Sequence, residues 1–397
     1  MNSKPQTYVS TTNACKTCMP LGACLAFRGI EGAVPFLHGS QGCATYMRRY
    51  IISHFREPMD IASSSLGEKH AVYGGGPNLK LGLTNVMSKY GAQMIGIATT
   101  CLTETIGDNV PMLVREFRDE FSDLIQDHGA PALVNVSTPS FSGTHMDGFH
   151  YAVKAAVEQL AEDVPSHCGA ALLPGFVSPA DTRYLKEVME DFGLNSVVLP
   201  DISLTLDAPA LLDYEKLPSG GTSISDIRRL GGSGSVIEFG RSIAGSPTAG
   251  KFLEDRFSIP LHSLGTPIGL RETDAFFQAV EEISGKQTPV SHALERGRLI
   301  DAYVDGHKYL FDQRVVVYGE EDLVIGLTAF LAEIGAKPVL CASGGRSRRM
   351  EKAIRELAQD LLPEPPMVLE GVDFYQIAEY AESLNPQLLI GNSKGYQ

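Results

Sequence analysis

The stretch that organises the chain spans residues 13–43 and reads N-A-C-K-T-C-M-P-L-G-A-C-L-A-F-R-G-I-E-G-A-V-P-F-L-H-G-S-Q-G-C. It holds four of the seven cysteines of this 397-residue chain, at positions 15, 18, 24 and 43. Because Cys18 comes just before Pro20, and proline favours the first turn of a helix, we expect Cys18 at a helix N-terminus. Cys43 ends the turn-rich run 38–42, and a helical pattern follows over residues 44–55.

Both positions suit a reactive sulfur. A thiolate at a helix N-terminus is stabilised by the helix dipole and by free backbone N–H groups. The glycines of the run 38–42 allow the backbone to approach a bound group closely. We therefore predict a soft-metal or reactive-thiol site, with a buried, unreactive thiol as the competing interpretation of each cysteine.

Length and composition limit the class of protein. A chain of 397 residues is expected to form two or three domains. The formal charge of −14 argues against nucleic acid and anionic membranes as partners. The N-terminus lacks the pattern of a signal peptide, and no apolar run is long enough to span a bilayer, which predicts a cytoplasmic protein. Disulfides are rare there, and an odd number of cysteines fits a disulfide framework poorly.

Apolar segments recur along the chain in the order strand, loop, helix. This alternation predicts an α/β fold of doubly wound, Rossmann-like domains with parallel sheets. We expect an N-terminal α/β domain at 1–165 that carries Cys18, Cys43 and Cys101, a second at 166–305 and a third at 306–397. The segments that carry this prediction are the strands 93–99, 132–136, 170–174, 196–199, 314–318, 338–341 and 388–391, with helices at 146–160, 180–191, 278–284 and 322–334.

Three loops are expected to meet at one edge of the first sheet. Parallel sheets bind ligands at the carboxyl ends of their strands. Cys43 follows the apolar segment 33–37, Cys101 follows the strand 93–99, and Ser140 follows the strand 132–136. We predict that Cys18, Cys43, Cys101 and, as a further candidate, Ser140 form one site. The competing interpretation of Ser140 is a turn former beside Pro139.

Several short segments resemble the β-type (K) subunit of nitrogenase component 1. They are C-M-P-L-G-A (18–23), H-G-S-Q-G-C (38–43), H-F-R-E-P (54–58), T-T-C-L-T-E-T-I-G-D (99–108), T-P-S-F-S-G-T-H (138–145), R-V-V-V-Y-G-E-E-D-L-V-I-G-L (314–327) and L-L-I-G-N-S-K-G (388–395). The resemblance implies three doubly wound domains and an α2β2 complex with an α-like (D-type) subunit. It also implies an [8Fe-7S] P-cluster shared at each α/β interface, and an ATP-hydrolysing iron protein that delivers electrons.

The resemblance also implies roles for single residues. Cys18, Cys43 and Cys101 would bind iron as the β-side cluster cysteines, and the Ser140 hydroxyl would join the cluster on oxidation. The catalytic metallocofactor would lie in the α partner, so no catalytic residue is expected in this chain. Independently, Fe–S clusters usually take four thiolates, whereas three equivalent loops offer three. Cysteines of a partner, or Cys15 of this chain, would complete the set.

The branch of the family is a separate question. The compact β-like chain, with Cys15 and Cys24 as additions, resembles the nitrogenase-like methylthio-alkane reductases, which cleave C–S bonds. Nitrogenase proper, reducing N2, is the second interpretation. Scaffold subunits of cofactor assembly are the third, although they typically lack cysteines matching Cys18 and Cys101. A metal-free doubly wound binding protein is the alternative from another class. The substrate and the completeness of the C-terminus are left open.

Other residues receive plainer interpretations. We expect Cys24, Cys168 and Cys341 to be structural. His38 and His145 flank the site and either tune a cluster by hydrogen bonding or satisfy a loop carbonyl. A basic helix beside Cys43 either balances an anionic cluster or is a solvated face; its members are Arg48, Arg49, His54 and Arg56. Glu104 and Asp108 are interpreted as helix-start acids, and no Ser–His–Asp set is assigned.

Overall fold

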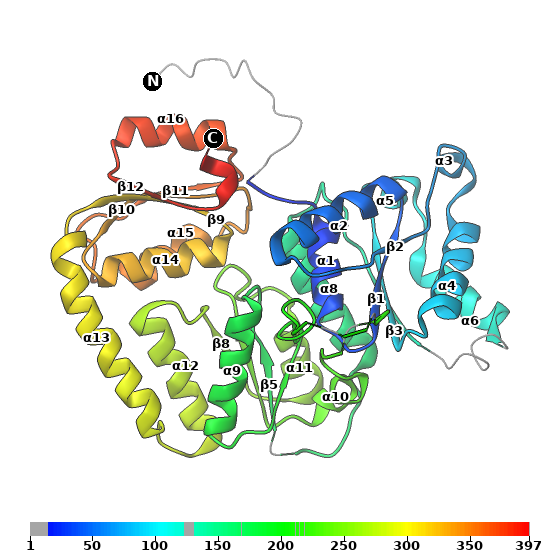
Figure 1. The fold of residues 1–397 in the computed structure, drawn as a ribbon, viewed down its shortest axis with the longest axis horizontal. Helices are drawn as coiled ribbons and strands as arrows, with labels where there is room; N and C mark the ends of the chain where they lie inside the picture. Colours follow the sequence, from blue (N-terminus) through cyan, green and yellow to red (C-terminus); the bar gives the residue numbers. More distant parts are fainter. Residues whose placement is uncertain are drawn as a thin grey trace. The chain divides into compact units, whose positions relative to one another are not determined.

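The computed structural model describes residues 15–122, 131–167, 169–210, 212–213, 215–217 and 219–396. The predicted N-terminal arm and Cys168 lie outside these residues. The chain forms two compact units (Figure 1). Unit 2 comprises Cys18–Thr266 and Thr273–Ala293, and unit 1 comprises Pro267–Glu272 and Leu294–Gln397 together with residues 15–17.

The first sheet of unit 2 is parallel and has the strand order β2-β1-β3-β4. Its strands are β1 (Ala33–His38), β2 (Ala62–Ser63), β3 (Met94–Thr99) and β4 (Ala132–Val136). β1 and β3 pair from Ala33↔Met94 to His38↔Thr99, so their carboxyl ends lie side by side. One hydrophobic cluster joins this sheet to α1 (Met19–Arg28), α2 (Gln41–Phe55) and α8 (His145–Leu160). A second cluster joins it to α4 (Gly76–Tyr90) and α6 (Val110–Glu120).

Helices α1 and α8 cross in close contact (Figure 1). A Cβ atom on Gly22 would lie 1.6 Å from the carbonyl oxygen of His145, and one on Gly148 would lie 1.9 Å from that of Met19. Only glycine allows backbones to approach this closely. The crossing therefore fixes α1, and with it Cys18, against α8.

The second sheet of unit 2 is also parallel, with the order β6-β5-β7-β8. Its strands are β5 (Ala170–Leu173), β6 (Ser196–Val198), β7 (Ser235–Phe239) and β8 (Leu261–Leu264). The elements around it are α9 (Pro179–Asp191), α10 (Ile224–Arg229), η1 (Leu230–Gly232), α11 (Ala249–Phe257) and α12 (Gly269–Ser284). The cluster that contains α1 and α8 continues into this sheet through Ala171 and Val236, so the two sheets share one core.

The third sheet lies in unit 1 and has the parallel order β11-β10-β9-β12. Its strands are β9 (Arg314–Gly319), β10 (Lys337–Ser343), β11 (Met367–Glu370) and β12 (Leu388–Ile390). Val315 and Val317 face a cluster with α14 (Glu321–Glu333) and α15 (Met350–Ala358). Val316 and Tyr318, which point the other way along the same strand, face α16 (Phe374–Leu384). η2 (Ser393–Tyr396) closes the described chain.

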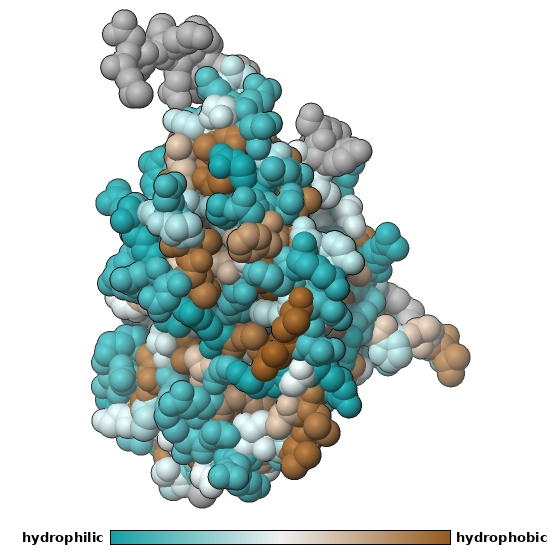
Figure 2. Space-filling model, turned by 90° about the vertical axis from the view of Figure 1, so that its left-hand side faces the viewer, coloured by the Kyte–Doolittle hydropathy of each residue, from teal (hydrophilic) through white to brown (hydrophobic). Residues whose placement is uncertain are grey.

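Helix α13 (Val290–Leu310) contributes residues to both units. Much of its surface is exposed, and the exposed side chains include Val290, Leu294 and Val304. Figure 2 shows apolar patches among hydrophilic side chains on the face turned toward the viewer. Within the described residues, no helix is both long enough and apolar enough to cross a bilayer.

The predicted fold class is confirmed, and the predicted strands match the observed ones to within two residues at either end. Two expectations differ from the structure. Residues 100–104 were expected in a loop, but Cys101–Ile106 forms helix α5, whose first turn is closed by the Thr100 N–H donating to Thr103 Oγ1 at 3.0 Å. The segment 278–284 is only the end of α12. The domain limits stay a prediction, and the limit between 305 and 306 falls inside α13.

Candidate functional site

Cys43 and Cys101 lie at the point of the first sheet where the strand order reverses. From β1 the chain moves outward to β2 and then returns to β3 on the other side, so this point lies between β1 and β3. Open α/β sheets bind ligands at such a point. Cys43 is in the first turn of α2, directly after β1, and Cys101 is the first residue of α5, directly after β3.

Cys18 occupies the N-cap of α1, with extended backbone angles, as the sequence predicted. Its side chain makes no capping hydrogen bond. The hydroxyl of Ser140 takes this place, since the backbone N–H of Met19 donates to Ser140 Oγ at 3.2 Å. The loop after β4 is thereby attached to the start of α1. The structure thus places the Ser140 hydroxyl beside Met19, the residue directly after Cys18.

The three thiols are close enough to influence one another electrostatically. Cys18 and Cys101 are exposed and Cys43 is half-buried. Burial raises the pKa of the Cys43 thiol, and negative charge on Cys18 and Cys101 raises it further. Three mutually repelling thiolates gain stability when a cation lies between them, because a bound metal reverses the sign of the local field.

The donor set fits an iron–sulfur cluster better than a single ion. Among the described residues, no three His, Cys, Asp or Glu side chains are arranged to hold one metal ion. A polynuclear cluster takes its thiolates on different iron atoms, so its ligands stand further apart. Soft thiolates without carboxylate or imidazole are the donors that such clusters use. Cys18, Cys43 and Cys101 therefore fit one side of a cluster.

A buried histidine lies behind the thiols. His38 is fully buried, with Nδ1 2.9 Å from Ser64 Oγ and Nε2 3.0 Å from Asp108 Oδ2. This is a Ser–His–Asp arrangement that the sequence did not predict. It is not a hydrolytic site, because Ser64 is only 3% exposed and its Oγ accepts the N–H of Gly39. Both ring nitrogens of His38 are used, so neither is left to hydrogen-bond a cluster.

Glu104 joins the ends of two strands. Its Oε1 accepts the hydroxyls of Thr99 and Ser137, each at 2.5 Å. Thr99 ends β3 and Ser137 follows β4. Glu104 and Asp108 are therefore more than helix-start acids, because each links the segment after Cys101 to another loop of the site. In the sequence, the only sign of this linking role was that Glu104 and Asp108 both follow Cys101 closely, four residues apart.

His145 starts α8 and has a buried Nδ1 that finds no hydrogen-bond partner within the described chain. Burial lowers the pKa of His145 to about 4, although the charge of Asp147 opposes this. Its ring packs edge-to-face against Phe176, with centroids 5.7 Å apart. The imidazole is therefore neutral at physiological pH, and the predicted bond from this ring to a loop carbonyl is not seen at Nδ1.

The basic helix beside Cys43 is α2. Arg48 donates from Nε to the carbonyl of Met59 at 2.7 Å and lies 3.4 Å from Asp60, so its charge is largely balanced. Arg48 and Arg49 line a cavity of about 490 Å³ between α2 and β2. Of the other two basic residues of this segment, His54 packs edge-to-face on Phe55, and Arg56 ends the helix with φ of 60°.

Two aromatic residues of α2, Tyr46 and Tyr50, were not identified as site residues from the sequence. Tyr46 and Tyr50 are 62% and 50% exposed. They follow Cys43 by three and seven residues, which places them on the same side of the helix as the thiol. Large exposed aromatic side chains beside a site are typical of a surface that contacts a partner. The helical spacing from Cys43 was the signal that could have found them.

Burial raises the pKa of each of the remaining described cysteines. Cys24 is fully buried in α1, and burial raises the pKa of its thiol. Cys341 is buried in β10, 3.1 Å from the hydroxyl of Thr328, and burial raises its pKa to about 12. Cys15 packs against the third sheet in unit 1, where burial and then the charge of Asp373 raise its pKa to about 12. Such thiols stay protonated at neutral pH.

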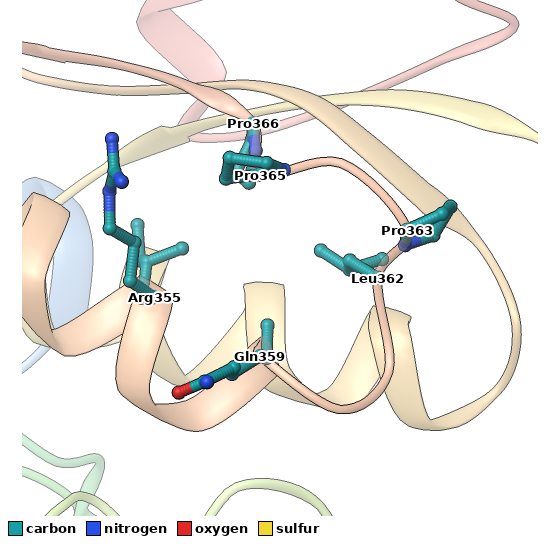
Figure 3. A pocket seen from close by; sticks show the side chains of 8 residues that line it. Arg355, Gln359, Leu362, Pro363, Pro365 and Pro366 are labelled. Carbon is teal, nitrogen blue, oxygen red and sulfur yellow. The ribbon is translucent and has the colours of Figure 1, made fainter.

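A cavity of about 400 Å³ lies in unit 1 between α15 and the segment that leads to β11. Figure 3 shows Arg355, Gln359, Leu362 and three prolines around it. Its only charged side chain, Arg355, is paired with Glu351 at 2.7 Å. None of its lining residues is a thiol, imidazole or carboxylate, so it is not a candidate for redox chemistry.

Comparison with known proteins gives consistent matches. A family model described as "Nitrogenase component 1 type Oxidoreductase" matches residues 18–397. The nitrogenase molybdenum-iron protein β chain of Clostridium pasteurianum is 36% identical over 384 residues, which cover 96% of this chain and 82% of that protein. The vanadium-iron protein β chain of Trichormus variabilis is 33% identical over 386 residues, with coverages of 96% and 82%.

Solved structures agree. A chain of the structure titled "Nitrogenase Cp1 at pH 6.5" superimposes with a TM-score of 0.92 at 34% identity, covering 98% of this chain and 84% of that one. A chain of "Nitrogenase Cp1 at pH 5" gives a TM-score of 0.67 at 14% identity, over 96% of this chain and 80% of that one. The second likeness concerns the fold alone.

Proposed function

The chain belongs to the nitrogenase component 1 type oxidoreductases, as a β-type chain of this iron–sulfur family, and from this premise we propose that it relays electrons. The observation that carries the proposal is that Cys18, Cys43 and Cys101, each at the N-terminal end of a different helix, come together beside the reversal point of the first sheet. We propose that these three thiolates bind the β side of an [8Fe-7S] P-cluster. When bound, such a cluster takes up and passes on single electrons.

The chain's own residues perform three tasks at this site. The thiolates of Cys18 and Cys43 sit at the N-termini of α1 and α2, where the helix dipoles stabilise their negative charge. Ser140 holds its hydroxyl oxygen beside Cys18 through the N–H of Met19. If Ser140 joins the cluster on oxidation, the deprotonated oxygen can keep accepting this N–H while it binds iron. The neighbouring loops hold the thiols in place.

We propose that an α-like subunit completes the site in an α2β2 complex. Cys18 and Cys101 are exposed in the isolated chain, as are Tyr46 and Tyr50 on α2. A partner seated here would cover the thiols and supply the missing cluster ligands. It would also hold the catalytic metallocofactor. An ATP-hydrolysing iron protein would deliver the electrons, in the cytoplasm.

Two substrates are candidates. We place N2 reduction first, because the relatives named above are nitrogenase β chains. C–S bond cleavage of methylthio-alkanes is the second candidate. It rests on the resemblance of the sequence to the methylthio-alkane reductases, and the similar identities to molybdenum and vanadium chains, 36% and 33%, do not separate the branches. The substrate is chosen mainly in the α-like partner, so this chain alone does not decide between them.

Iron and sulfide analysis of the anaerobically purified complex, with EPR, tests the proposal. We expect about eight iron atoms at each αβ interface, in addition to any iron of the partner's metallocofactor, and no EPR signal from the interface cluster when it is fully reduced. About four iron atoms with a signal of a reduced [4Fe–4S] cluster would favour an assembly scaffold instead. A complex without iron or sulfide would contradict both and favour a metal-free binding protein.

The substrate is tested with ATP and the iron protein present. Ammonia from N2 would support nitrogenase activity. Release of a thiol and a hydrocarbon from a methylthio-alkane would support C–S cleavage. A complex that contains the cluster but turns over neither substrate would favour the assembly scaffold over both reductases.

A further inference from the structure

The segments that lead into the helices of Cys43 and Cys101 are joined through buried polar groups. The carbonyl oxygen of His38 accepts the N–H of Thr100 at 3.2 Å and the hydroxyl of Thr103 at 2.9 Å. Thr103 Oγ1 in turn accepts the N–H of Thr100 at 3.0 Å. The start of α5 is therefore attached to the end of β1, five residues before Cys43.

Asp108 adds a second link two residues after α5. The side chain of Asp108 is 9% exposed, and its Oδ2 lies 3.0 Å from His38 Nε2. The same carboxylate accepts the N–H of Gly75, at 3.0 and 3.2 Å for its two oxygens. A Cβ on Gly75 would lie 2.6 Å from Asp108 Oδ2 and 2.8 Å from the His38 ring, so the cradle around this pair excludes any larger residue.

The link continues from His38 to the loop of Cys43. Because Nε2–H donates to Asp108, Nδ1 of the neutral ring accepts the hydroxyl of Ser64 at 2.9 Å. Ser64 Oγ accepts the N–H of Gly39, also at 2.9 Å. Gly39 opens the turn that leads to Ser40, the N-cap of α2. One chain of hydrogen bonds thus runs from the segment after Cys101 to the turn before Cys43.

We propose that Asp108 and His38 are positioning residues that set the distance between the sulfurs of Cys43 and Cys101. The inference rests on the proposed function, since it assumes that these thiols bind one cluster. A carboxylate that holds a buried neutral imidazole restricts that ring to one tautomer and one orientation. Here the ring is packed against the backbone that leads to one thiol, and the carboxylate belongs to the segment that follows the other.

A second His–Asp pair in unit 2 provides a control, although the side chain of Asp191 is 52% exposed and that of Asp108 only 9%. His292 Nε2 lies 2.8 Å from Asp191 Oδ2, and the His292 side chain is 8% exposed. No described cysteine takes part in its hydrogen bonds. Removing either carboxylate leaves a buried histidine without its acceptor. Only the Asp108 variant is expected to change the thiol spacing.

The first test needs no cluster. In the full chain, Cys15, Cys18 and Cys168 are replaced by serine, and nitroxide labels are attached to Cys43 and Cys101. Dipolar broadening in the EPR spectrum then reports the label separation. We expect Asp108→Ala to widen the spread of separations and Asp191→Ala to leave it unchanged. Equal spectra for Asp108→Ala and the parent chain would overturn the proposal, as would equal broadening by both variants.

His38→Gln keeps the test decisive if Asp108→Ala does not fold. A glutamine can donate to Asp108 but cannot also reach Ser64 as the ring does, so we expect an intermediate broadening. An unchanged label separation in this folded variant would count against the proposal.

The second test uses the complex. We expect Asp108→Ala to lose iron to a chelator about ten- to a hundredfold more readily than the parent, and to change the EPR signal of the oxidised cluster. Asp191→Ala should neither speed the loss of iron nor change the EPR signal. Equal iron loss by the two variants would contradict the proposal. If the parent complex holds no iron, the proposed function fails, while the spin-label result still decides the positioning role.

Discussion

The first and third sheets are both parallel and four-stranded, yet the loops at their carboxyl edges differ in chemistry. At the first edge thiols lie among hydroxyls, two carboxylates and a buried histidine, and two of the thiols are exposed. At the third edge the loops carry carboxylates and arginines. Glu321, which is 7% exposed, accepts the N–H of Ser347 at 2.9 Å, and Glu370 accepts the N–H of Arg348 at 2.9 Å.

The loops of the third edge therefore hydrogen-bond one another, with carboxyl groups accepting backbone N–H groups. Burial, and then the neighbouring Asp322, raises the pKa of Glu320 to about 8, and burial raises that of Glu321 to about 7. At the first edge the internal hydrogen bonds hold the loops in place, while the thiols of Cys18 and Cys101 stay exposed. A doubly wound sheet thus supplies the crevice, whereas the loop residues decide whether it is closed by the chain or left for a ligand.

The largest effect is expected for Cys101→Ala. Because Cys101 is exposed, its removal should leave the fold intact while electron transfer to the partner falls at least about a hundredfold. Activity of the reconstituted complex and circular dichroism measure the two effects. Cys341→Ala, which removes a buried thiol from the third sheet, should lower stability but keep the activity of the folded protein. Full activity of Cys101→Ala would contradict the ligand assignment.

Gly22→Ala should unfold or displace α1. Its Cβ would meet the carbonyl oxygen of His145 at 1.6 Å, so we expect a loss of about 3 kcal/mol or more in the free energy of unfolding, and loss of iron with it. At Gly297, in α13, an added Cβ would meet no atom within 4 Å. Gly297→Ala should therefore raise stability by about 0.5–1 kcal/mol. Urea unfolding measures the change in the free energy of unfolding for each variant. A change of the same sign in both variants would contradict the prediction that only Gly22 lies in a close helix crossing.

Glu321→Gln tests whether the third edge holds a protonated carboxyl. Because folding raises the pKa of Glu321 from 4.5 to about 7, its contribution to stability is present below about pH 4.5 and lost as the pH rises through 7. The variant should be more stable than the parent by about 2–3 kcal/mol at pH 8 and similar to it at pH 5. Thermal unfolding across this range is the measurement. Glu379→Gln, on the exposed side of α16, should show no such dependence.

The smallest effect compares two helix caps. Ser40 caps α2 after β1 and Asp373 caps α16 after β11, each accepting a backbone N–H of the first turn. Replacing either by alanine should cost about 1 kcal/mol. Only Ser40→Ala is expected also to speed the loss of iron to a chelator, since α2 carries Cys43. The same iron loss in Asp373→Ala would mean that general stability, not the cap beside Cys43, governs iron retention.

Local sequence patterns were enough to predict the fold class, most of the strands and the neighbourhood of the thiols, but the strands β2, β7, β8 and β11 were not predicted. Apolar runs marked the strands because residues buried on both sides of a parallel sheet must be hydrophobic throughout. Cys43 and Cys101 could be placed at one edge because strand ends of a parallel sheet meet there. Cys18 could be placed at a helix start from Pro20. Each of these patterns depends on a few adjacent residues.

How the loops are held became visible only in the folded chain. Ser140 and Met19 are 121 residues apart in the chain, and His38 and Asp108 are 70 apart. No local pattern links them, because a hydrogen bond between distant residues leaves no periodicity in the sequence. The same holds for the contact of Gly22 with α8, and for the division into two units, which places Cys15 with the third sheet and Cys18 with the first. Packing of distant segments, not local propensity, sets these positions.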